Sequence, residues 1–538
     1  MSNMSESDGE WGDERRSFAS RTPVNDNPEK VEYRRGFVTR HQVTGWRFVM
    51  RRIASGIALH DTRMLVEPLR TQSRAVVMGV LLLITGLIGC FVFSLIRPNG
   101  QVGNNIVLAD RSTAALYVRV GDQLHPVLNL TSARLIAGQP VNPTTVKSAE
   151  LDKFPRGNLV GIPGAPERMV QSSARDADWT VCDGVSGQPG RGARSTGVTV
   201  IAGQPDTAGA RAAAINSGQV ILVDAAASGG DGTWVLWDGK RSRIDLADHA
   251  VTNALGLGND VPAPRPIASG LFNAIPEAPP LTAPPIPNAG SPAGFVVPAP
   301  IGGVVVSYAV GRSASDSISY YAVLPDGLQP ISPVLAAILR NTNSYGLQQP
   351  PRLGADEIAK LPVSRLLDTS RYPAQPVTPI SAASNPVTCG FWSKPTGAAT
   401  SSLSLLSGSA LPVPEGRRSV ELVGGGAKVA LAPGTGYFAQ TVGGGAAAPA
   451  TGSLFWISDT GVRYGIDNEA DGRSGSSGRA KAVEALGLQS PPVGIPWSIL
   501  SLFAPGPTLS RADALLAHDG LPPDSRPGHP VSAEGEPR

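Results

Sequence analysis

The side chains that most often carry chemistry are few in this chain of 538 residues, and they lie far apart. The three cysteines are Cys90, Cys182 and Cys389, and none has a partner at the short spacing that a zinc site requires. The six histidines are equally isolated: His41, His60, His125, His249, His518 and His529. The residues therefore predict no metal site.

The chain also lacks the motifs of nucleotide binding and acyl transfer. A phosphate-binding loop needs a glycine, four residues and then Gly-Lys-Ser or Gly-Lys-Thr, because its backbone amides cradle the phosphates and its hydroxyl binds magnesium. The nearest segment contains Gly239-Lys240, but Arg241 follows and Trp234 stands where the first glycine belongs. No Gly-x-Ser-x-Gly nucleophile motif occurs.

Carboxylates give no stronger signal for catalysis. Asp356 and Glu357 are adjacent, but acids in such a position more often begin a helix. Asp238, Asp326 and Asp459 recur at equivalent turns, which predicts a structural role. We therefore predict no catalytic residue and no cofactor, and expect a membrane-anchored structural or interaction protein.

The anchor is predicted at residues 75–96, which contain no charged side chain and lie between Arg74 and Arg97. Twenty-two residues in a helix rise about 33 Å, enough to cross the hydrocarbon core of a bilayer. Residues 33–74 contain nine arginines and two acids, whereas residues 97–134 contain four arginines and two acids. Basic residues near a span stay cytoplasmic, so we expect a cytoplasmic N-terminus and an exported C-terminal part. A cleavable signal peptide would lie nearer residue 1.

The exported part, residues 97–538, carries 33 basic and 33 acidic residues, which argues against a nucleic-acid partner. Cys182 and Cys389 are its two cysteines. An even pair in an oxidising compartment favours a disulfide. Closing a loop of roughly 200 residues would stabilise the fold by about 5 kcal/mol. Two free buried thiols are the alternative.

Within residues 33–74, a basic amphipathic helix is predicted from about Thr39 to Val66, before Pro68. Five apolar residues recur at spacings of three and four and form one stripe: Val43, Trp46, Met50, Ile53 and Ile57. The arginines lie mainly off this stripe: Arg40, Arg47, Arg51 and Arg52.

Such a helix lies on anionic lipid or packs into the groove of a partner protein. The Gly45-Trp46 and Asp61-Thr62-Arg63 details favour a protein partner. The expected docking residues are Gln42, Val43, Trp46, Arg47, Met50, Arg51, Arg52, Ile53, Asp61 and Arg63.

Four similar hairpins divide the exported part. Each places an apolar strand, a turn and a second strand before a short helical stretch, and Asp-Gly between apolar runs is a strong hairpin signal. The turns are Gly121-Asp122, Asp238-Gly239, Asp326-Gly327 and Asp459-Thr460-Gly461. Units this small stack to bury a core, so we predict repeats near 106–138, 216–258, 301–342 and 451–488. Further strands are expected at Gln219–Asp224, Gly303–Tyr308 and Lys428–Ala432.

The repeats lie within a predicted periplasmic domain, residues 97–520, which is mainly β with short helices and of the α+β class. The intervals 140–215 and 342–450 each hold one exported cysteine, which predicts a central domain joined by the disulfide. The Pro-rich stretch 261–300 is expected to be a strap on the fold. Residues 1–32 and 521–538 are predicted to be disordered tails.

The segment Gln42–Arg52 resembles the signature of the EccB family, the B components of the actinobacterial type VII (ESX) secretion core. The resemblance covers nearly the whole chain apart from the tails. It continues at the two exported cysteines and at Ala58-Leu59, Asp61–Met64, Pro68–Arg70, Leu271–Pro287 and Pro505–Arg511.

The resemblance implies a structural core subunit of the ESX membrane complex, with one inner-membrane span. Its cytoplasmic helix would dock on the core subunits EccC, EccD and EccE. Its periplasmic repeats would form a distorted propeller around a central domain and self-associate. Overall resemblance leans towards the paralogue linked to iron and zinc acquisition.

Two alternative functions stay open. The family carries an ATPase label, which would make the chain a hydrolase that binds ATP, although it has no phosphate loop. A cell-wall binding module would need an aromatic groove, for which Trp234, Trp237, Tyr320 and Tyr321 are the candidates, although core packing is the simpler role for them.

Overall fold

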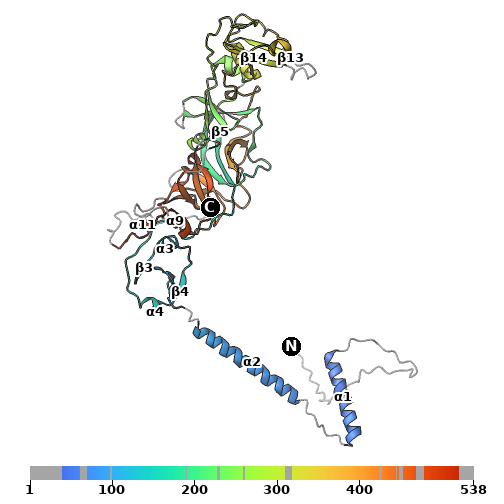
Figure 1. The fold of residues 1–538 in the computed structure, drawn as a ribbon, viewed down its shortest axis with the longest axis vertical. Helices are drawn as coiled ribbons and strands as arrows, with labels where there is room; N and C mark the ends of the chain where they lie inside the picture. The colour runs from blue at the N-terminus through green and yellow to red at the C-terminus, as the bar shows by residue number, and fades with distance from the viewer. Residues whose placement is uncertain are drawn as a thin grey trace, which may run out of the picture. The chain divides into compact units, whose positions relative to one another are not determined.

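The computed structural model describes residues 39–60, 69–96, 100–188, 191–226, 231–258, 261–308, 318–422, 427–443, 445–447, 452–467 and 478–519. The chain divides into two compact units, Met1–Pro98 and Asn99–Arg538. The first unit contains α1 (Arg40–Leu59) and α2 (Leu69–Ile96) (Figure 1).

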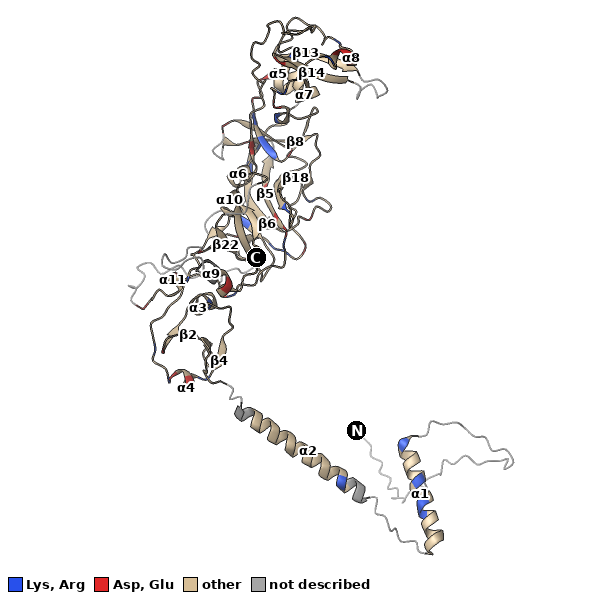
Figure 2. Ribbon diagram, viewed as in Figure 1, with Lys and Arg blue, Asp and Glu red and all other residues tan. Residues whose placement is uncertain are grey.

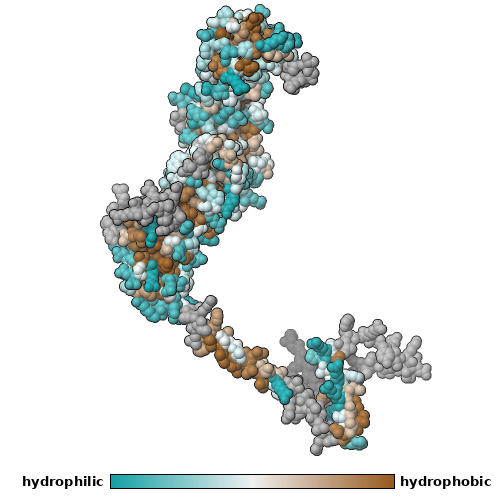
Figure 3. All heavy atoms as spheres, in the orientation of Figure 1, coloured by the Kyte–Doolittle hydropathy of each residue, from teal (hydrophilic) through white to brown (hydrophobic). Residues whose placement is uncertain are grey.

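Helix α2 contains the segment Ser73–Phe93, the one stretch among the described residues that is long and apolar enough to cross a membrane. Its 28 residues rise about 42 Å. Apolar residues cover most of its surface in Figure 3. This agrees with a single-pass membrane protein, and the strands and short helices of the second unit agree with the expected α+β class.

The described residues of the second unit form four repeats, each a three-stranded antiparallel meander followed by a helix. We number them in chain order. The first is β1 (Val107–Asp110), β2 (Leu116–Val120), β3 (Gln123–Pro126) and α3 (Leu130–Ala137). The second is β8 (Gln219–Asp224), β9 (Thr233–Trp237), β10 (Lys240–Ile244) and α5 (His249–Ala254). The third is β13 (Val304–Tyr308), β14 (Ile318–Leu324), β15 (Gly327–Ile331) and α7 (Pro333–Thr342).

The fourth repeat is β21 (Tyr437–Val442), β22 (Leu454–Ile457), β23 (Val462–Ile466) and α9 (Gly478–Leu486). Its first strand begins before the predicted range 451–488. The segment expected to supply that strand, Lys428–Ala432, instead contains β20 (Lys428–Ala430), which pairs with β6 (Arg191–Ala202) of another sheet. An apolar run alone does not say which neighbour a strand will pair with.

Each repeat is completed by two further segments. The first runs parallel to the first strand of the repeat: β4 (Thr144–Val146) beside β1, β11 (Arg265–Pro266) beside β8, β24 (Val493–Pro496) beside β21, and Arg352 bridged to Val306. The second runs parallel to the third strand: Arg156 bridged to Leu124, β12 (Glu277–Ala278) beside β10, Val363 bridged to Leu328, and β25 (Ala504–Pro505) beside β23.

One short helix lies between these two segments in every repeat: α4 (Ser148–Leu151), α6 (Ser269–Ala274), α8 (Ala355–Ile358) and α10 (Trp497–Leu500). The stretch 261–300, expected to be a strap, therefore contains the completing half of the second repeat. The two segments cover both edges of each meander, which would otherwise expose unpaired backbone groups.

Side-chain caps fix where the repeat helices begin. Asn129 accepts a hydrogen bond from the backbone N–H of Ser132 at the start of α3, and Asp248 accepts from Ala250 at the start of α5. Ser332 accepts from Leu335 at the start of α7, whose first residue is Pro333. Capping side chains and an N-terminal proline are the expected signals at such positions.

A seven-stranded sheet forms the centre, in the order β19-β20-β6-β5-β17-β18-β7. Its long strands are β5 (Ala177–Gln188), β6 (Arg191–Ala202), β17 (Val387–Lys394) and β18 (Ser402–Gly408). The short strands are β7 (Ala213–Ala214), β19 (Val420–Glu421) and β20. Its strands come from two segments, one between the first and second repeats and one between the third and fourth.

Apolar cores join these parts in pairs. The first and fourth repeats share a core with α3, α9 and α11 (Arg511–Ala514), and it contains Val118, Leu135, Trp456 and Leu486. The second and third share a core in which α5 packs on α7, with Val235, Leu335 and Ile338. The largest core joins the central sheet to the opposite faces of the second and fourth repeats. Outside these cores, the short strand β16 (Thr378–Pro379) pairs with β8, and a 3₁₀ turn covers Thr369–Arg371.

The turn of the second repeat closely contacts the central sheet. Gly239 has φ +70°, and a Cβ at this position would overlap the carbonyl oxygen of Leu403 on β18. Gly121, in the turn of the first repeat, has φ +60° but open space around it.

These two glycines form a matched test of that contact. Gly121→Ala should lower the free energy of unfolding by about 1–2 kcal/mol, because alanine is strained in the left-handed backbone conformation. Gly239→Ala should lower the free energy of unfolding by about 1–3 kcal/mol more than Gly121→Ala does, because β18 must also move away from the new methyl group. Thermal unfolding of the full chain in detergent measures both, and equal losses would contradict the contact.

Candidate docking helix and disulfide-linked centre

Helix α1 begins with a reciprocal cap. The backbone N–H of Thr39 donates to Oε1 of Gln42 at 2.9 Å, and the N–H of Gln42 donates to Oγ1 of Thr39 at 3.4 Å. The helix ends at His60, which has φ 48°. Gln42, expected to be a docking residue, therefore fixes the helix start.

The apolar stripe of α1 is exposed along its whole length. Successive residues turn by about 100°, so Val43, Trp46, Met50, Ile53 and Ile57 lie within an arc of about 80°. Trp46 is 65% exposed and Ile57 is 73% exposed. No residue of α1 is buried against another described part of the chain.

Figure 2 shows that basic residues recur along α1, the helix that carries this stripe. By the same rotation, Arg40, Arg47 and Arg51 lie beside it and Arg52 lies nearly opposite its centre. Asp61 and Arg63, the last two expected docking residues, lie outside the described residues.

The two exported cysteines form a disulfide between neighbouring strands of the central sheet. Cys182 on β5 lies directly opposite Cys389 on β17, and 207 residues separate them in sequence. Both are fully buried. The bond therefore ties together the two segments that build the central sheet.

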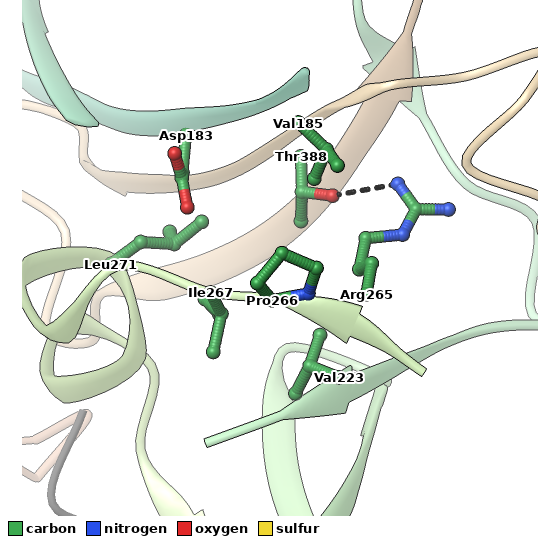
Figure 4. A pocket seen from close by; sticks show the side chains of 8 residues that line it. All are labelled: Asp183, Val185, Val223, Arg265, Pro266, Ile267, Leu271 and Thr388. Atoms are coloured by element: carbon green, nitrogen blue, oxygen red, sulfur yellow. Dashed lines mark hydrogen bonds between the residues drawn. The ribbon is translucent and has the colours of Figure 1, made fainter. Parts of the chain in front are cut away.

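Next to the disulfide lies a buried guanidinium. Arg265 is 4% exposed and donates to the carbonyl oxygens of Ile380 and Asn385, both at 2.7 Å, and to Oγ1 of Thr388 at 3.1 Å (Figure 4). Burial lowers the pKa of Arg265 to about 10, so it stays charged at neutral pH. These hydrogen bonds attach β11 of the second repeat to the segment that leads into β17.

A buried carboxylate lines the same space as Arg265, and it belongs to Asp183, which lies opposite Thr388 in the pairing of β5 with β17. Asp183 accepts hydrogen bonds from Oγ of Ser195 at 2.8 Å and from the backbone N–H of Ala268 at 2.7 Å. Burial raises the pKa of Asp183, because the loss of solvent outweighs these hydrogen bonds. The space that Asp183 and Arg265 line has no room for a water molecule, and the hydrogen bonds of these two side chains hold segments of the fold together.

The side chains considered above for nucleotide binding and for acid-base catalysis contact other parts of the fold. Lys240 lies over the ring of Trp237 at 3.8 Å and donates to the carbonyl of Ser370, in a hairpin and not before a helix. Glu357 accepts from the N–H of Gly354 and caps α8. Among the described residues, no group of His, Cys, Asp and Glu could hold a metal ion.

The aromatic residues considered for a binding groove are packed. Trp234 and Trp237 are buried, and Tyr320 and Tyr321 pack on separate cores. The indole N–H of Trp237 donates to Oγ of Ser242 at 3.2 Å.

Sequence reasoning missed Arg265 and Asp183. The signal for Arg265 was that it is the single charged residue in the Pro-rich run Pro262–Pro266. A lone charge in such a run indicates a specific structural partner. Asp183, beside Cys182, gave no signal of its own.

Comparison with known proteins identifies a family and relatives that this chain resembles. A family model described as "Type VII secretion system ESX-1, transport TM domain B" matches residues 35–523. The chain is 74% identical over 536 residues to "ESX-3 secretion system ATPase EccB3" of Mycobacterium tuberculosis, covering 98% of each chain.

Two solved structures are similar. One is the "EccB3 dimer from the ESX-3 core complex", with 58% identity and a TM-score of 0.68 over 77% of this chain and all of that chain. The other is an "intact ESX-5 inner membrane complex", with 38% identity and a TM-score of 0.68 over 93% of this chain and 99% of that one.

The disulfide should contribute strongly to stability. Replacing both Cys182 and Cys389 by alanine should lower the free energy of unfolding by about 5 kcal/mol, because the 207-residue separation makes the closed loop long. Unfolding of the full chain without reductant measures this. Cys90→Ala, in exposed α2, is the control and should unfold like wild type. A double variant as stable as wild type would contradict the prediction.

Asp183 should make stability depend on pH. Its pKa is higher in the fold than in the unfolded chain, so its contribution is complete below about pH 4 and is lost as the pH rises through the folded pKa. Asp183→Asn should therefore gain stability relative to wild type between about pH 3 and pH 7.

Asp176→Asn is the control for this measurement and should show the opposite slope. The N–H of Thr396 donates to Asp176 and lowers the pKa of that carboxyl. Parallel pH profiles for the two variants would contradict the assignment of Asp183.

Proposed function

The chain belongs to the EccB family of the type VII (ESX) secretion system, and we propose that it works as a scaffold of an ESX inner-membrane complex that docks the translocase through α1. The observation that carries the proposal is the exposed apolar stripe of α1. A soluble helix normally buries such a face, so an uncovered stripe indicates a partner surface.

Two features favour a protein groove over a lipid surface for α1. The stripe spans only about 80°, which suits insertion between helices. The defined helix start at Thr39 and Gln42 places Trp46 nearly two turns into the helix, at a fixed point for recognition. The partners that the family implies are EccC, EccD and EccE.

We propose that α1 lies in the cytoplasm and that the repeat unit lies in the periplasm. The excess of arginine in residues 33–74 supports this orientation. The disulfide of the second unit supports it too, because disulfides persist in oxidising compartments.

The repeat unit is proposed to self-associate in the periplasm. In support, a relative with 58% identity was solved as a dimer. The distorted-propeller arrangement, the domain limits and the disorder of the tails stay predictions. The identity to an ESX-3 protein of Mycobacterium tuberculosis supports the iron- and zinc-linked system.

The second candidate function is ATP hydrolysis, which the printed names of the relatives suggest. Against it, the one Gly-Lys pair considered lies in the β9–β10 turn, with its lysine on Trp237. A phosphate loop instead precedes a helix whose N-terminus faces the phosphates. Binding of the cell wall has less support still, because the four aromatic side chains considered for a binding groove pack against apolar cores.

Two aromatic side chains on opposite faces of α1 test the docking proposal. Trp46 lies on the stripe and Phe48 lies on the other side of the helix, and both are exposed. Trp46→Ala should reduce the recovery of the EccC and EccD subunits with a C-terminally tagged chain by at least about tenfold, whereas Phe48→Ala should not. Mass spectrometry after purification from mycobacterial membranes in mild detergent measures both.

Arg51→Glu with Arg52→Glu extends the test to charge and should also reduce recovery. Equal recovery with Trp46→Ala and Phe48→Ala would overturn the docking role. ATP hydrolysis by the purified chain free of other subunits is the second readout. We expect none above background, and saturable hydrolysis would favour the enzyme reading.

A further inference from the structure

Helix α1 carries four arginines and no acidic residue, and three of the arginines form a row along one side of its apolar stripe. Arg40, Arg47 and Arg51 fall within an arc of about 40°, next to the edge of the stripe that Val43 occupies. Beyond the opposite edge, at Ile53, the next four positions around the helix are uncharged: Gln42, Val49, Gly56 and Gly45. The stripe therefore has an arginine row on one side and no charge on the other.

No described part of the chain neutralises the arginine row. All three side chains are exposed, and none has an ion pair or a side-chain hydrogen bond with a described residue. Arg47 and Arg51 are four residues apart, a spacing at which like charges destabilise a helix. Arg40 is the first residue of α1, where a positive charge opposes the helix dipole. Both placements weaken the isolated helix, so they indicate a negatively charged partner.

Neither membrane topology nor lipid binding requires a row on one side. The number of basic residues near a span sets its orientation, whichever face of a helix they occupy. A helix that lies flat on anionic lipid has both sides of its apolar face at the level of the headgroups, so basic residues on either side serve it. An arginine row on one side fits a protein groove whose two walls differ in charge.

We propose that one wall of the groove that receives α1 is acidic and faces the arginine row, an inference that rests on the docking role proposed above. The row rises about 16 Å from Arg40 to Arg51. Carboxylates along the wall pair with the guanidinium groups, whose planar shape suits two parallel hydrogen bonds to one carboxylate.

The acidic wall also determines the direction of α1 in the groove. Reversing the helix end for end, with the stripe still facing the groove, would move the arginine row to the opposite wall. Only one direction therefore brings the row against the carboxylates, so charge supplies specificity in addition to the apolar contact of the stripe.

Charge reversal at two neighbouring residues tests the acidic wall. Arg51→Glu places a carboxylate within the arginine row, whereas Arg52→Glu makes the same change in net charge about 100° away around the helix. We expect Arg51→Glu to lower the recovery of partner subunits, with a C-terminally tagged full chain in mild detergent, at least about tenfold more than Arg52→Glu does. His41→Glu is the control, because His41 is exposed nearly opposite the stripe, and it should leave recovery at the wild-type level.

A zero-length cross-link detects the acidic wall directly. Helix α1 contains no lysine, so Arg51→Lys and Arg52→Lys each give it a single amine that a carbodiimide can join to a carboxylate in contact. Mass spectrometry should locate a link from the amine of Arg51→Lys to an Asp or Glu of a recovered subunit. The amine of Arg52→Lys should form no such link.

Equal losses of recovery from Arg51→Glu and Arg52→Glu, or equal linkage from the two lysine variants, would overturn the acidic wall. Equal losses without any link to a protein carboxylate would indicate anionic lipid instead. If Trp46→Ala still lowers recovery in these cases, the docking role of α1 is retained and only the acidic wall is wrong. If Trp46→Ala and Phe48→Ala give equal recovery, the docking role itself is wrong.

Discussion

The pairing of β5 with β17 is the constraint on which the second unit depends. It joins two segments that lie on either side of the second and third repeats, and it runs from Ala177 opposite Lys394 to Gly184 opposite Val387. Such a long-range pairing has a large loop-closure cost, and every other part of the central sheet is added to it. The disulfide at Cys182 and Cys389 lies within this register, so a slip of one residue would separate the two sulfur atoms.

The repeats show why this centre is needed. Each meander has two apolar faces, and one helix covers only one of them. The first and fourth repeats share one core and the second and third share another. The other faces of the first and third repeats form small cores of their own, which leaves one face of the second and one of the fourth to be covered. The central sheet packs on both of these faces through one core that contains Trp179, Leu236, Leu271 and Phe503. This sharing of faces agrees with the order of the chain, in which the second and third repeats lie between the two segments that build the central sheet.

Sequence patterns predicted the parts that local chemistry determines. Asp238-Gly239 and Asp326-Gly327 lie in hairpin turns because these residues adopt the backbone angles that a tight turn needs. The completing strands could not be predicted, because β11 and β12 have two residues each and show no alternation. The pairing of β20 with the central sheet, and the burial of Asp183 and Arg265, arise from contacts distant in sequence. Periodicity along one segment does not contain them.

The second unit buries its apolar faces, whereas the stripe of α1 in the first unit is exposed. This contrast supports an interaction role for α1. In the second unit, tryptophans such as Trp179 and Trp456 are almost completely buried, and the helices α3, α5 and α7 each bury one face. Helix α1 has a comparable apolar stripe and an equally well-defined cap, yet buries none of its residues. Isolated helices gain most of their stability from packing an amphipathic face. A sequence that specifies the start of α1 this well, and leaves its apolar stripe uncovered, is suited to a partner that supplies the missing surface.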